Sequence, residues 1–217
     1  MLTYDKLKAK YDLYLAALEQ RLKNNPHDRE ALIHRAVMLY DFYQEPDEAA
    51  AILQSIVDKD PNCVDAYLWI GEFERFFTGD FDKAVEYLKQ AVAIDPNRAD
   101  CHALLAGVIA EFKATDPKEV EYHYRKSFEL EPTFINPRFY LAYYFWKLGK
   151  FGEARHELEE ALKYVADGEW PTNNPVEEYY EDMITGRLSS NRRQEILDFI
   201  QKIDAAESAT KMEPDEA

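Results

Sequence analysis

The sequence predicts an all-α protein built as a solenoid of helical hairpins, and three observations lead to this fold class. Proline recurs as Pro26, Pro61, Pro96 and Pro132, at intervals of 35, 35 and 36 residues, and a fixed period of about 20 to 50 residues is typical of stacked repeats. Apolar residues recur at helical spacing on both sides of a turn in each period. Only 7 Gly and 10 Pro among 217 residues, together with 14% aromatic residues, exclude collagen-like and disordered chains.

The second half of each period carries the same residue classes at fixed distances before the proline. These positions lie at helical spacing. They are Ala49, Leu53 and Ile56; Ala84, Leu88 and Ala91; Val120, Tyr124 and Ser127; and Ala154, Leu158 and Ala161.

The first half of each period places a small residue beside a large one, as in Ala66-Tyr67, Leu105-Ala106 and Leu141-Ala142. Small residues in mid-helix let a neighbouring helix approach closely. The turn signals Thr78-Gly79-Asp80 and Leu148-Gly149-Lys150 separate the two halves. Each period is therefore expected to form a hairpin of two helices.

These motifs resemble the tetratricopeptide repeat family. The best unit contains Ile70-Gly71, then Gly79-Asp80-Phe81, then Ala84, Leu88, Ala91 and Asp95-Pro96. The resemblance covers about residues 26–165 in four units, and it implies a right-handed αα-superhelix of about eleven helices. The first three units are longer than the 34 residues usual in the family, which we interpret as lengthened first helices.

The chain is expected to have four parts. Residues 1–25 form an N-terminal helix, and residues 26–165 form four hairpins. Residues 166–206 form capping helices, one starting at Asn174-Pro175 and the last covering about 191–206, because the ends of a solenoid need a polar cover. Residues 207–217 are expected to be a disordered acidic tail.

Motifs for catalysis are missing from the sequence, so a non-catalytic protein is expected, with no cofactor and no metal. The glycines are scattered rather than gathered in a phosphate-binding loop, and the five histidines have no metal-ligand spacing. One enzymatic alternative places a site in residues 166–217, where Trp170, Tyr179 and Tyr180 lie among acidic residues.

Charge and cysteine content restrict the partners and the compartment. The formal net charge of −16 disfavours binding to nucleic acid and to anionic membranes. No secretory signal or membrane span is recognisable, so a cytoplasmic location is expected. Cys63 and Cys101 are predicted to be free thiols, because equivalent regions of neighbouring repeats lie too far apart for a disulfide.

The resemblance also implies that the first helices line a concave groove that binds a protein or peptide. By offset, the groove residues would be Ile33, Val37 and Tyr40; Leu68, Glu72 and Arg75; Ala103, Gly107 and Ala110; and Phe139, Tyr143 and Trp146. The alternative is that these residues pack between repeats or are covered by the C-terminal helices. Positions at which some family members hold chaperone tails contain no cation here; they are Ile33, Val37, Trp69, Asn136 and Tyr140.

The sequence therefore favours an interaction module, and its acidity favours a basic partner. Glu30, Asp65 and Asp100 recur every 35 residues at the start of the first helices. They either stabilise the helix dipoles or form an acidic rim that attracts the partner. One specific version is an immunity-type inhibitor that neutralises a basic toxin. The alternatives are a self-assembling scaffold and a subunit of an enzyme complex, and the chain itself is expected to be a monomer or weak homodimer.

Overall fold

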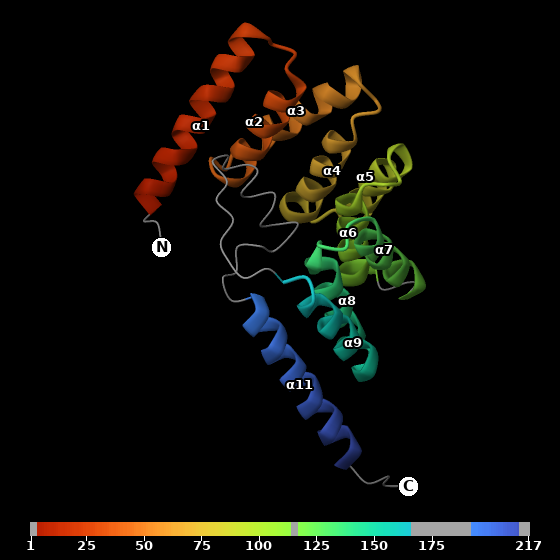
Figure 1. Ribbon diagram of the computed structural model, residues 1–217. Coiled ribbons are helices and arrows are strands. Elements are labelled where there is room, and N and C mark those ends of the chain that lie inside the picture. The colour runs from red at the N-terminus through yellow and green to blue at the C-terminus, as the bar shows by residue number, and fades with distance from the viewer. Residues whose placement is uncertain (1–3, 114–116, 166–191, 213–217) are drawn as a thin grey trace.

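The computed structural model of the chain describes residues 4–113, 117–165 and 192–212 as a curved array of helices (Figure 1). These residues contain ten α-helices, two short π-helical segments and no strand. The all-α class predicted from the sequence is thus confirmed. The helix expected to start at Asn174-Pro175 lies outside the described residues.

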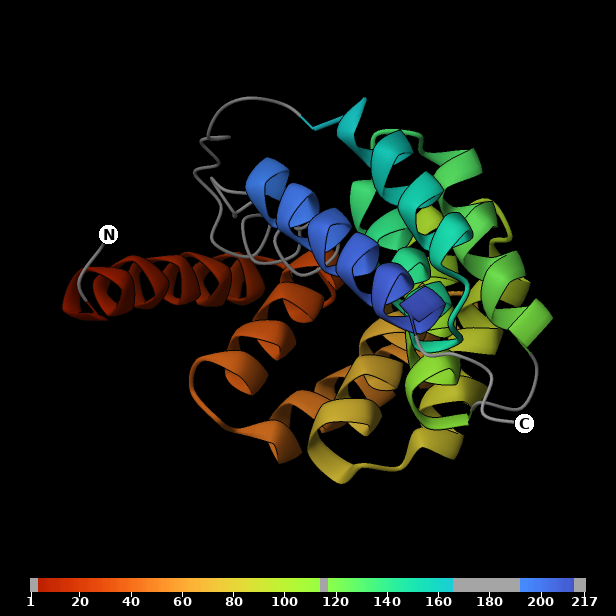
Figure 2. The same ribbon diagram turned by 90° about the horizontal axis from the view of Figure 1, so that it is seen from below.

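Four antiparallel hairpins occupy the middle of the chain, and each pairs a first helix with a second helix. They are α2 (Arg29–Asp41) with α3 (Pro46–Lys59), α4 (Val64–Phe73) with α5 (Phe81–Ile94), α6 (Ala99–Val108) with α7 (Pro117–Leu130), and α8 (Ile135–Lys147) with α9 (Phe151–Leu162). Each helix packs mainly on its hairpin partner, and the second helices α3, α5 and α7 also pack on the first helix of the next hairpin. The hairpins follow one another around a curve (Figure 2), as in other repeat proteins.

The periodic residues of the second helices form the core of every hairpin. All twelve are buried, from Ala49 in α3 to Ala161 in α9. Close approach of the paired helices explains why small residues recur. A Cβ atom added to Gly71 of α4 would lie only 2.7 Å from Cγ of Leu88 in α5, so a larger residue at position 71 would push these helices apart.

The recurring Asp-Pro dipeptides form the turns between hairpins. The carboxylate of Asp60 accepts a hydrogen bond from the backbone N–H of Asn62 (3.1 Å), and Asp95 accepts one from Asn97 (2.9 Å). Before α2, the side-chain oxygen of Asn25 likewise accepts a hydrogen bond from the backbone N–H of His27 (3.2 Å). An acidic or amide side chain therefore stabilises these three turns locally, while the proline that follows it cannot continue the preceding helix.

In the second and third repeats, which are longer than 34 residues, the end of the first helix is π-helical. After α4 and α6 the chain forms the π-helical segments η1 (Glu74–Thr78) and η2 (Ile109–Lys113). The backbone N–H of Asp80 donates to the carbonyl of Glu74, six residues back (3.1 Å). Gly79 has a φ of 68°, which glycine adopts readily.

The first and fourth repeats show what the extra residue does. In the first, the N–H of Glu45 also reaches six residues back, to the carbonyl of Leu39 (2.8 Å), and Gln44 takes a φ of 56°. In the fourth, where the interval from 132 to 166 is 34 residues, the N–H of Lys150 reaches five residues back, to Phe145 (2.9 Å). The longer repeats therefore widen one turn instead of extending a regular helix.

Long helices lie at both ends of the array. The N-terminal helix α1 (Tyr4–Asn24) packs on α2, where Leu18 is buried and the Tyr14 hydroxyl lies 2.7 Å from Nδ1 of His34. The C-terminal helix α11 (Arg192–Met212) packs on α9 through the buried residues Ile196 and Ile203.

The last helix extends beyond the boundary expected from the sequence. It ends at Met212 instead of near residue 206, so the first six residues of the expected tail are helical. Arg155 of α9 holds this part by ion pairs of 2.6 Å to Asp204 and Glu207. Alanine and glutamate in this stretch also favour a helix.

Candidate functional site

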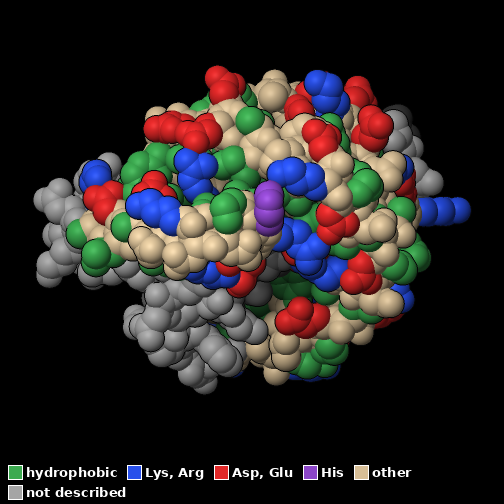
Figure 3. All heavy atoms as spheres, turned by 90° about the horizontal axis from the view of Figure 1, so that it is seen from above, with side chains coloured by type: hydrophobic (Ala, Val, Ile, Leu, Met, Phe, Trp, Pro, Cys, Tyr) green, Lys and Arg blue, Asp and Glu red, His purple; other side chains and the backbone are tan. Residues whose placement is uncertain are grey.

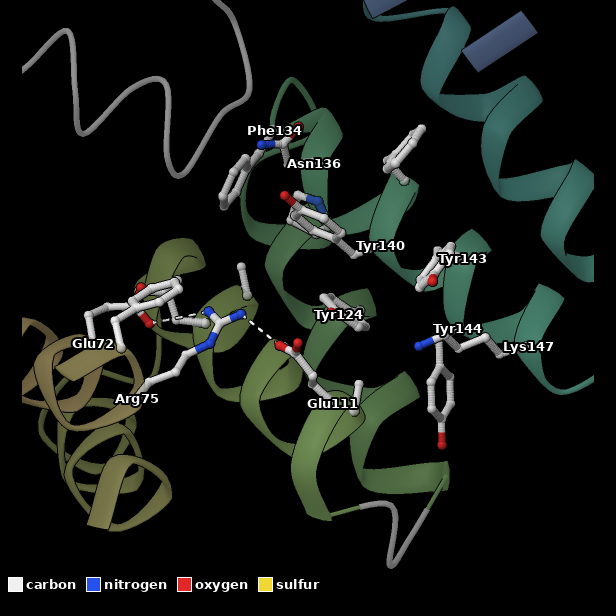
Figure 4. A pocket seen from close by; sticks show the side chains of 17 residues that line it. Glu72, Arg75, Glu111, Tyr124, Phe134, Asn136, Tyr140, Tyr143, Tyr144 and Lys147 are labelled. Atoms are coloured by element: carbon white, nitrogen blue, oxygen red, sulfur yellow. Dashed lines mark hydrogen bonds and ion pairs between the residues drawn. The ribbon is translucent and has the colours of Figure 1, made fainter. Parts of the chain in front are cut away.

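A cavity of about 500 Å³ lies between the first helices of the second, third and fourth repeats. Figure 4 shows side chains from α4, η1, α6, η2 and α8 around it, with α7 behind. Its lining consists of Glu72, Arg75, Phe76, Ala103, Leu104, Gly107, Ala110, Glu111, Tyr124, Phe134, Asn136, Pro137, Phe139, Tyr140, Tyr143, Tyr144 and Lys147. A pocket of this size and apolar character is typical of ligand-binding sites.

The cavity exists because α6 presents small residues where its neighbours present large ones. Ala103, Gly107 and Ala110 follow one another along one face of α6 and η2 and form the floor. Behind them the hydroxyl of Tyr124 lies 3.7 Å from the position that a Cβ of Gly107 would take. Burial raises the pKa of Tyr124, so this hydroxyl is uncharged.

One wall of the cavity carries a row of charges. The Arg75 guanidinium lies 3.0 Å from Oε2 of Glu111 and 3.7 Å from Oε1 of Glu72 (Figure 4). Glu72 is only 2% exposed, whereas the side chain of Glu111 is 52% exposed. Two carboxylates therefore face one guanidinium, and the more deeply buried carboxylate is the less screened by water.

The opposite wall is aromatic and comes from α8. Phe139, Tyr140 and Tyr143 line it, and both tyrosines are exposed. The ammonium of Lys147 lies 4.6 Å above the Tyr143 ring, a favourable cation–π distance.

The C-terminal helix supports this aromatic wall from behind. The ring centroid of Phe199 in α11 lies 5.5 Å from that of Phe139, 6.1 Å from Tyr143 and 5.7 Å from Trp146. These distances are typical of aromatic pairs. Part of the surface that the sequence places in the groove is thus in contact with α11.

The structure brings together some of the residues proposed from the sequence. Seven of them line the cavity: Glu72, Arg75, Ala103, Gly107, Ala110, Phe139 and Tyr143. Ile33, Val37 and Leu68 belong to the hydrophobic core instead. Tyr40 stacks on Phe73, with 3.9 Å between the ring centroids, and Trp146 contacts Phe199.

Several lining residues were not selected by the sequence pattern. Phe76 and Glu111 line the cavity from the π-helical segments η1 and η2. The wider turn there changes which residues face the groove, so the regular repeat spacing did not select them. Tyr124 comes from the second helix α7, whereas the resemblance implies a groove lined by first helices. The sequence did point to Asn136 and Tyr140 as possible binding residues, because they occupy positions at which some family members hold chaperone tails.

Two histidines are buried in the third hairpin, away from the lining of the cavity. Nδ1 of His102 lies 2.8 Å from Nδ1 of His123, and Nε2 of His102 lies 3.0 Å from the carbonyl of Pro96. Burial lowers the pKa of both rings, and the neighbouring His102 lowers that of His123 further, to about 4. Both rings are therefore neutral at pH 7.

The recurring acidic residues at the starts of the first helices are engaged in ion pairs. Arg98 lies 2.9 Å from Asp65 and also pairs with Asp100, which is buried. Arg21 lies 2.9 Å from Glu30. On the face seen in Figure 3, acidic and basic side chains are interspersed. This pairing argues against a continuous acidic rim made by the three residues.

Other kinds of site find no support in the part of the chain that the structure describes. Within it, no group of three His, Cys, Asp or Glu side chains could hold a metal ion, and no helix there is both long and apolar enough to cross a membrane. Cys63 and Cys101 are buried free thiols, so the prediction made for the two cysteines is confirmed.

Comparison with known proteins agrees with this architecture. Residues 44–99 match a family model described as a tetratricopeptide repeat. No curated protein matches the chain significantly.

Several solved structures have a similar fold. PilW, a widely conserved type IV pilus biogenesis factor, is 16% identical, with a TM-score of 0.63 over 95% of this chain and 88% of its own. TTC0263, a thermophilic tetratricopeptide repeat protein of Thermus thermophilus, is 22% identical, with a TM-score of 0.61 over 82% and 92%. YrrB, described as having an unusual peptide-binding site, is 18% identical, with a TM-score of 0.57 over 90% and 98%. At these identities the likeness concerns the fold.

Proposed function

Because residues 44–99 match a tetratricopeptide repeat model and the helices are arranged as in solved proteins of that kind, we propose that the chain is a non-catalytic module that binds a partner protein or peptide through its concave groove. The observation that carries this proposal is the cavity between α4, α6 and α8. It is lined by first helices of successive repeats, and two of its tyrosines, Tyr140 and Tyr143, are exposed. YrrB, a protein of similar fold, is described as having a peptide-binding site.

The partner we propose is basic, as it would be for an inhibitor that neutralises a cationic protein. The net charge of −16 supports this choice, because opposite charge accelerates association. Glu111 adds a half-exposed carboxylate at the cavity itself. Because acidic and basic side chains are interspersed on the surface, we propose that the net charge of the chain, and not a continuous acidic rim, attracts the basic partner.

The experiment compares partner capture by the wild type and by a groove variant. Tyr140→Ala together with Tyr143→Ala removes two exposed rings from the cavity. Tyr122→Ala is the matched control, because Tyr122 is an exposed tyrosine on the second helix α7. We expect the groove variant to lose a partner that the control retains, since exposed aromatic residues in pockets contribute strongly to binding. Circular dichroism and thermal melting verify that both variants fold.

Retention of every partner by the groove variant would contradict binding in the cavity. It would place the interface on the outer wall or on the terminal helices. Trp146 is left unchanged in this design because it is partly buried and packs on Phe199. Tyr143 is exposed but also lies 6.1 Å from Phe199, so the folding check on the groove variant includes the hydrogen-exchange protection of α11.

A second candidate function is self-assembly, favoured by exposed aromatic residues at the turn after α4. Phe76 and Phe77 of η1 are 60% and 56% exposed, and such residues are enriched at protein interfaces. A scaffold that assembles through them would show a mass that rises with concentration in light scattering. Phe77→Ser would then restore the monomer mass, whereas a concentration-independent monomer would exclude assembly.

A further inference from the structure

We propose that the cavity between α4, α6 and α8 holds one large aromatic side chain of the partner, adjacent in the partner's sequence to a lysine or arginine. This inference rests on the proposed function and adds the chemistry of the anchoring residue. It follows from the shape of the cavity, the composition of its walls and the distribution of charge around it.

The shape of the cavity suits an aromatic anchor. The inner positions of α6 and η2 are Ala103, Gly107 and Ala110, whereas the neighbouring segments η1 and α8 carry long side chains such as Arg75 and Phe139. The missing side chains leave about 500 Å³, within the range of pockets that enclose small organic groups. A tryptophan, tyrosine or phenylalanine side chain would bury most of its surface there.

The composition of the walls favours an aromatic group over an aliphatic one. Phe76 and Tyr140 line the cavity from opposite sides, on η1 and α8, and both are strongly exposed. A ring inserted between the walls can pack face to face or edge to face against them. It would also remove both exposed rings from water, which is favourable.

The charges around the cavity favour a cation beside the anchor. Glu72 and Glu111 both lie on Arg75, so this wall has one carboxylate more than it has guanidinium groups. Lys147 of the other wall balances this excess within the lining, and both Lys147 and Glu111 are exposed to water. The net charge of −16 of the whole chain therefore gives the field around the cavity its negative sign.

Three indole probes of similar shape and different charge test this inference on the full chain. They are 3-methylindole, which is neutral, tryptamine, a cation, and indole-3-acetate, an anion. Binding is followed by saturation-transfer NMR and by the shifts of backbone amide signals from α6 and α8. We expect millimolar binding with tryptamine about threefold tighter than 3-methylindole, the scale of one partly exposed ion pair, and indole-3-acetate the weakest.

Matched variants locate the binding and the charge effect. Gly107→Leu fills the cavity from its floor and should abolish binding of all three probes, whereas Gly107→Ala, whose Cβ makes only an ordinary 3.7 Å contact, should keep it. Ala103→Leu provides a second filled cavity should the first variant not fold. Glu111→Gln should reduce tryptamine to the affinity of 3-methylindole, while Glu153→Gln on the exposed surface of α9 should leave it unchanged.

The possible results separate this inference from the proposed function. Absence of binding by every probe, undiminished binding by both filled variants, or a preference for indole-3-acetate would each overturn the inference. If partner capture still depended on Tyr140 and Tyr143, the groove would remain the interface and only the aromatic, cationic anchor would be rejected. If probe binding did not depend on the cavity and partner capture did not depend on Tyr140 and Tyr143, the proposed function would be rejected as well.

Discussion

Two glycines in the first helices differ in what surrounds them. Gly71 faces α5, and a Cβ there would collide with Leu88 at 2.7 Å. Gly107 faces the cavity, and a Cβ there would make an ordinary contact of 3.7 Å with the Tyr124 hydroxyl. The same substitution therefore has a different physical consequence in each helix.

We expect Gly71→Ala to lower the free energy of unfolding by about 1–3 kcal/mol, the usual cost of overpacking a close helix contact. Gly107→Ala should instead raise it, by up to about 1 kcal/mol, because alanine loses less conformational entropy than glycine in a helix. Chemical denaturation followed by circular dichroism measures both values. An equal effect of the two substitutions would contradict the packing described at position 71.

The paired histidines make the third hairpin sensitive to acid. In the fold the pKa of His123 is lowered to about 4, chiefly by burial and then by His102, whereas Glu119 raises it and Lys89 lowers it. In the unfolded chain a histidine titrates near pH 6.5. The unfolded state therefore binds more protons between these values, so the fold loses stability as the pH falls from about 6.5 to about 4.

Replacing His123 by glutamine should remove much of this loss. We expect the wild type to lose up to about 3 kcal/mol of unfolding free energy from this residue over that interval, and the variant to show a flatter profile. Urea denaturation at a series of pH values gives the comparison. A histidine that is exposed, His156→Gln, is the control, and equal slopes in all three proteins would contradict the buried pair.

At the scale of helices, the π-helical turns show where the longer repeats place their additional residue. A sequence interval of 35 or 36 reveals an insertion but does not reveal its position. The core contacts of α4 with α5 determine the position of the insertion, because Gly71 must stay opposite Leu88. The insertion is therefore accommodated after these contacts, in a turn that also directs Phe76 and Arg75 toward the cavity.

The last helix depends on a few contacts with the fourth repeat. Ile203 of α11 is fully buried, whereas Leu197 on the same helix is 38% exposed. We expect Ile203→Asp to detach α11 and lower the hydrogen-exchange protection of its amides by roughly 100-fold, while α2 to α7 stay protected, because repeats contact only their neighbours. Leu197→Asp is the control, and unchanged protection in Ile203→Asp would contradict the docking of α11.

For the whole molecule, charge should govern how fast a partner is found. Arg21 and Arg98 pair with the recurring acidic residues, so attraction depends on the net charge of −16 and on local groups such as Glu111. We expect the association rate of a captured basic partner to fall roughly tenfold between about 0.1 and 1 M salt, with a smaller change in the dissociation rate. Stopped-flow or surface-binding kinetics test this, and a rate independent of salt would reject the basic partner.

The sequence alone determined the repeat architecture of this chain. The period and the buried positions depend on interactions within one hairpin, and the Asp-Pro turns depend on contacts between residues two apart, so short-range residue spacing encodes all three directly. It also placed Glu72, Arg75, Phe139 and Tyr143 on inner helices, because each helix face follows from the repeat register.

Only the tertiary structure decided which inner residues meet around a cavity. Ile33, Val37 and Leu68 occupy positions of the same kind, yet they are buried in the core, and Tyr40 stacks on Phe73. Their surroundings depend on how far neighbouring repeats rotate relative to one another and on which surfaces the terminal helices cover. The residue spacing within one repeat specifies neither. The cavity arises where α6, with small side chains, lies between two helices that carry large ones.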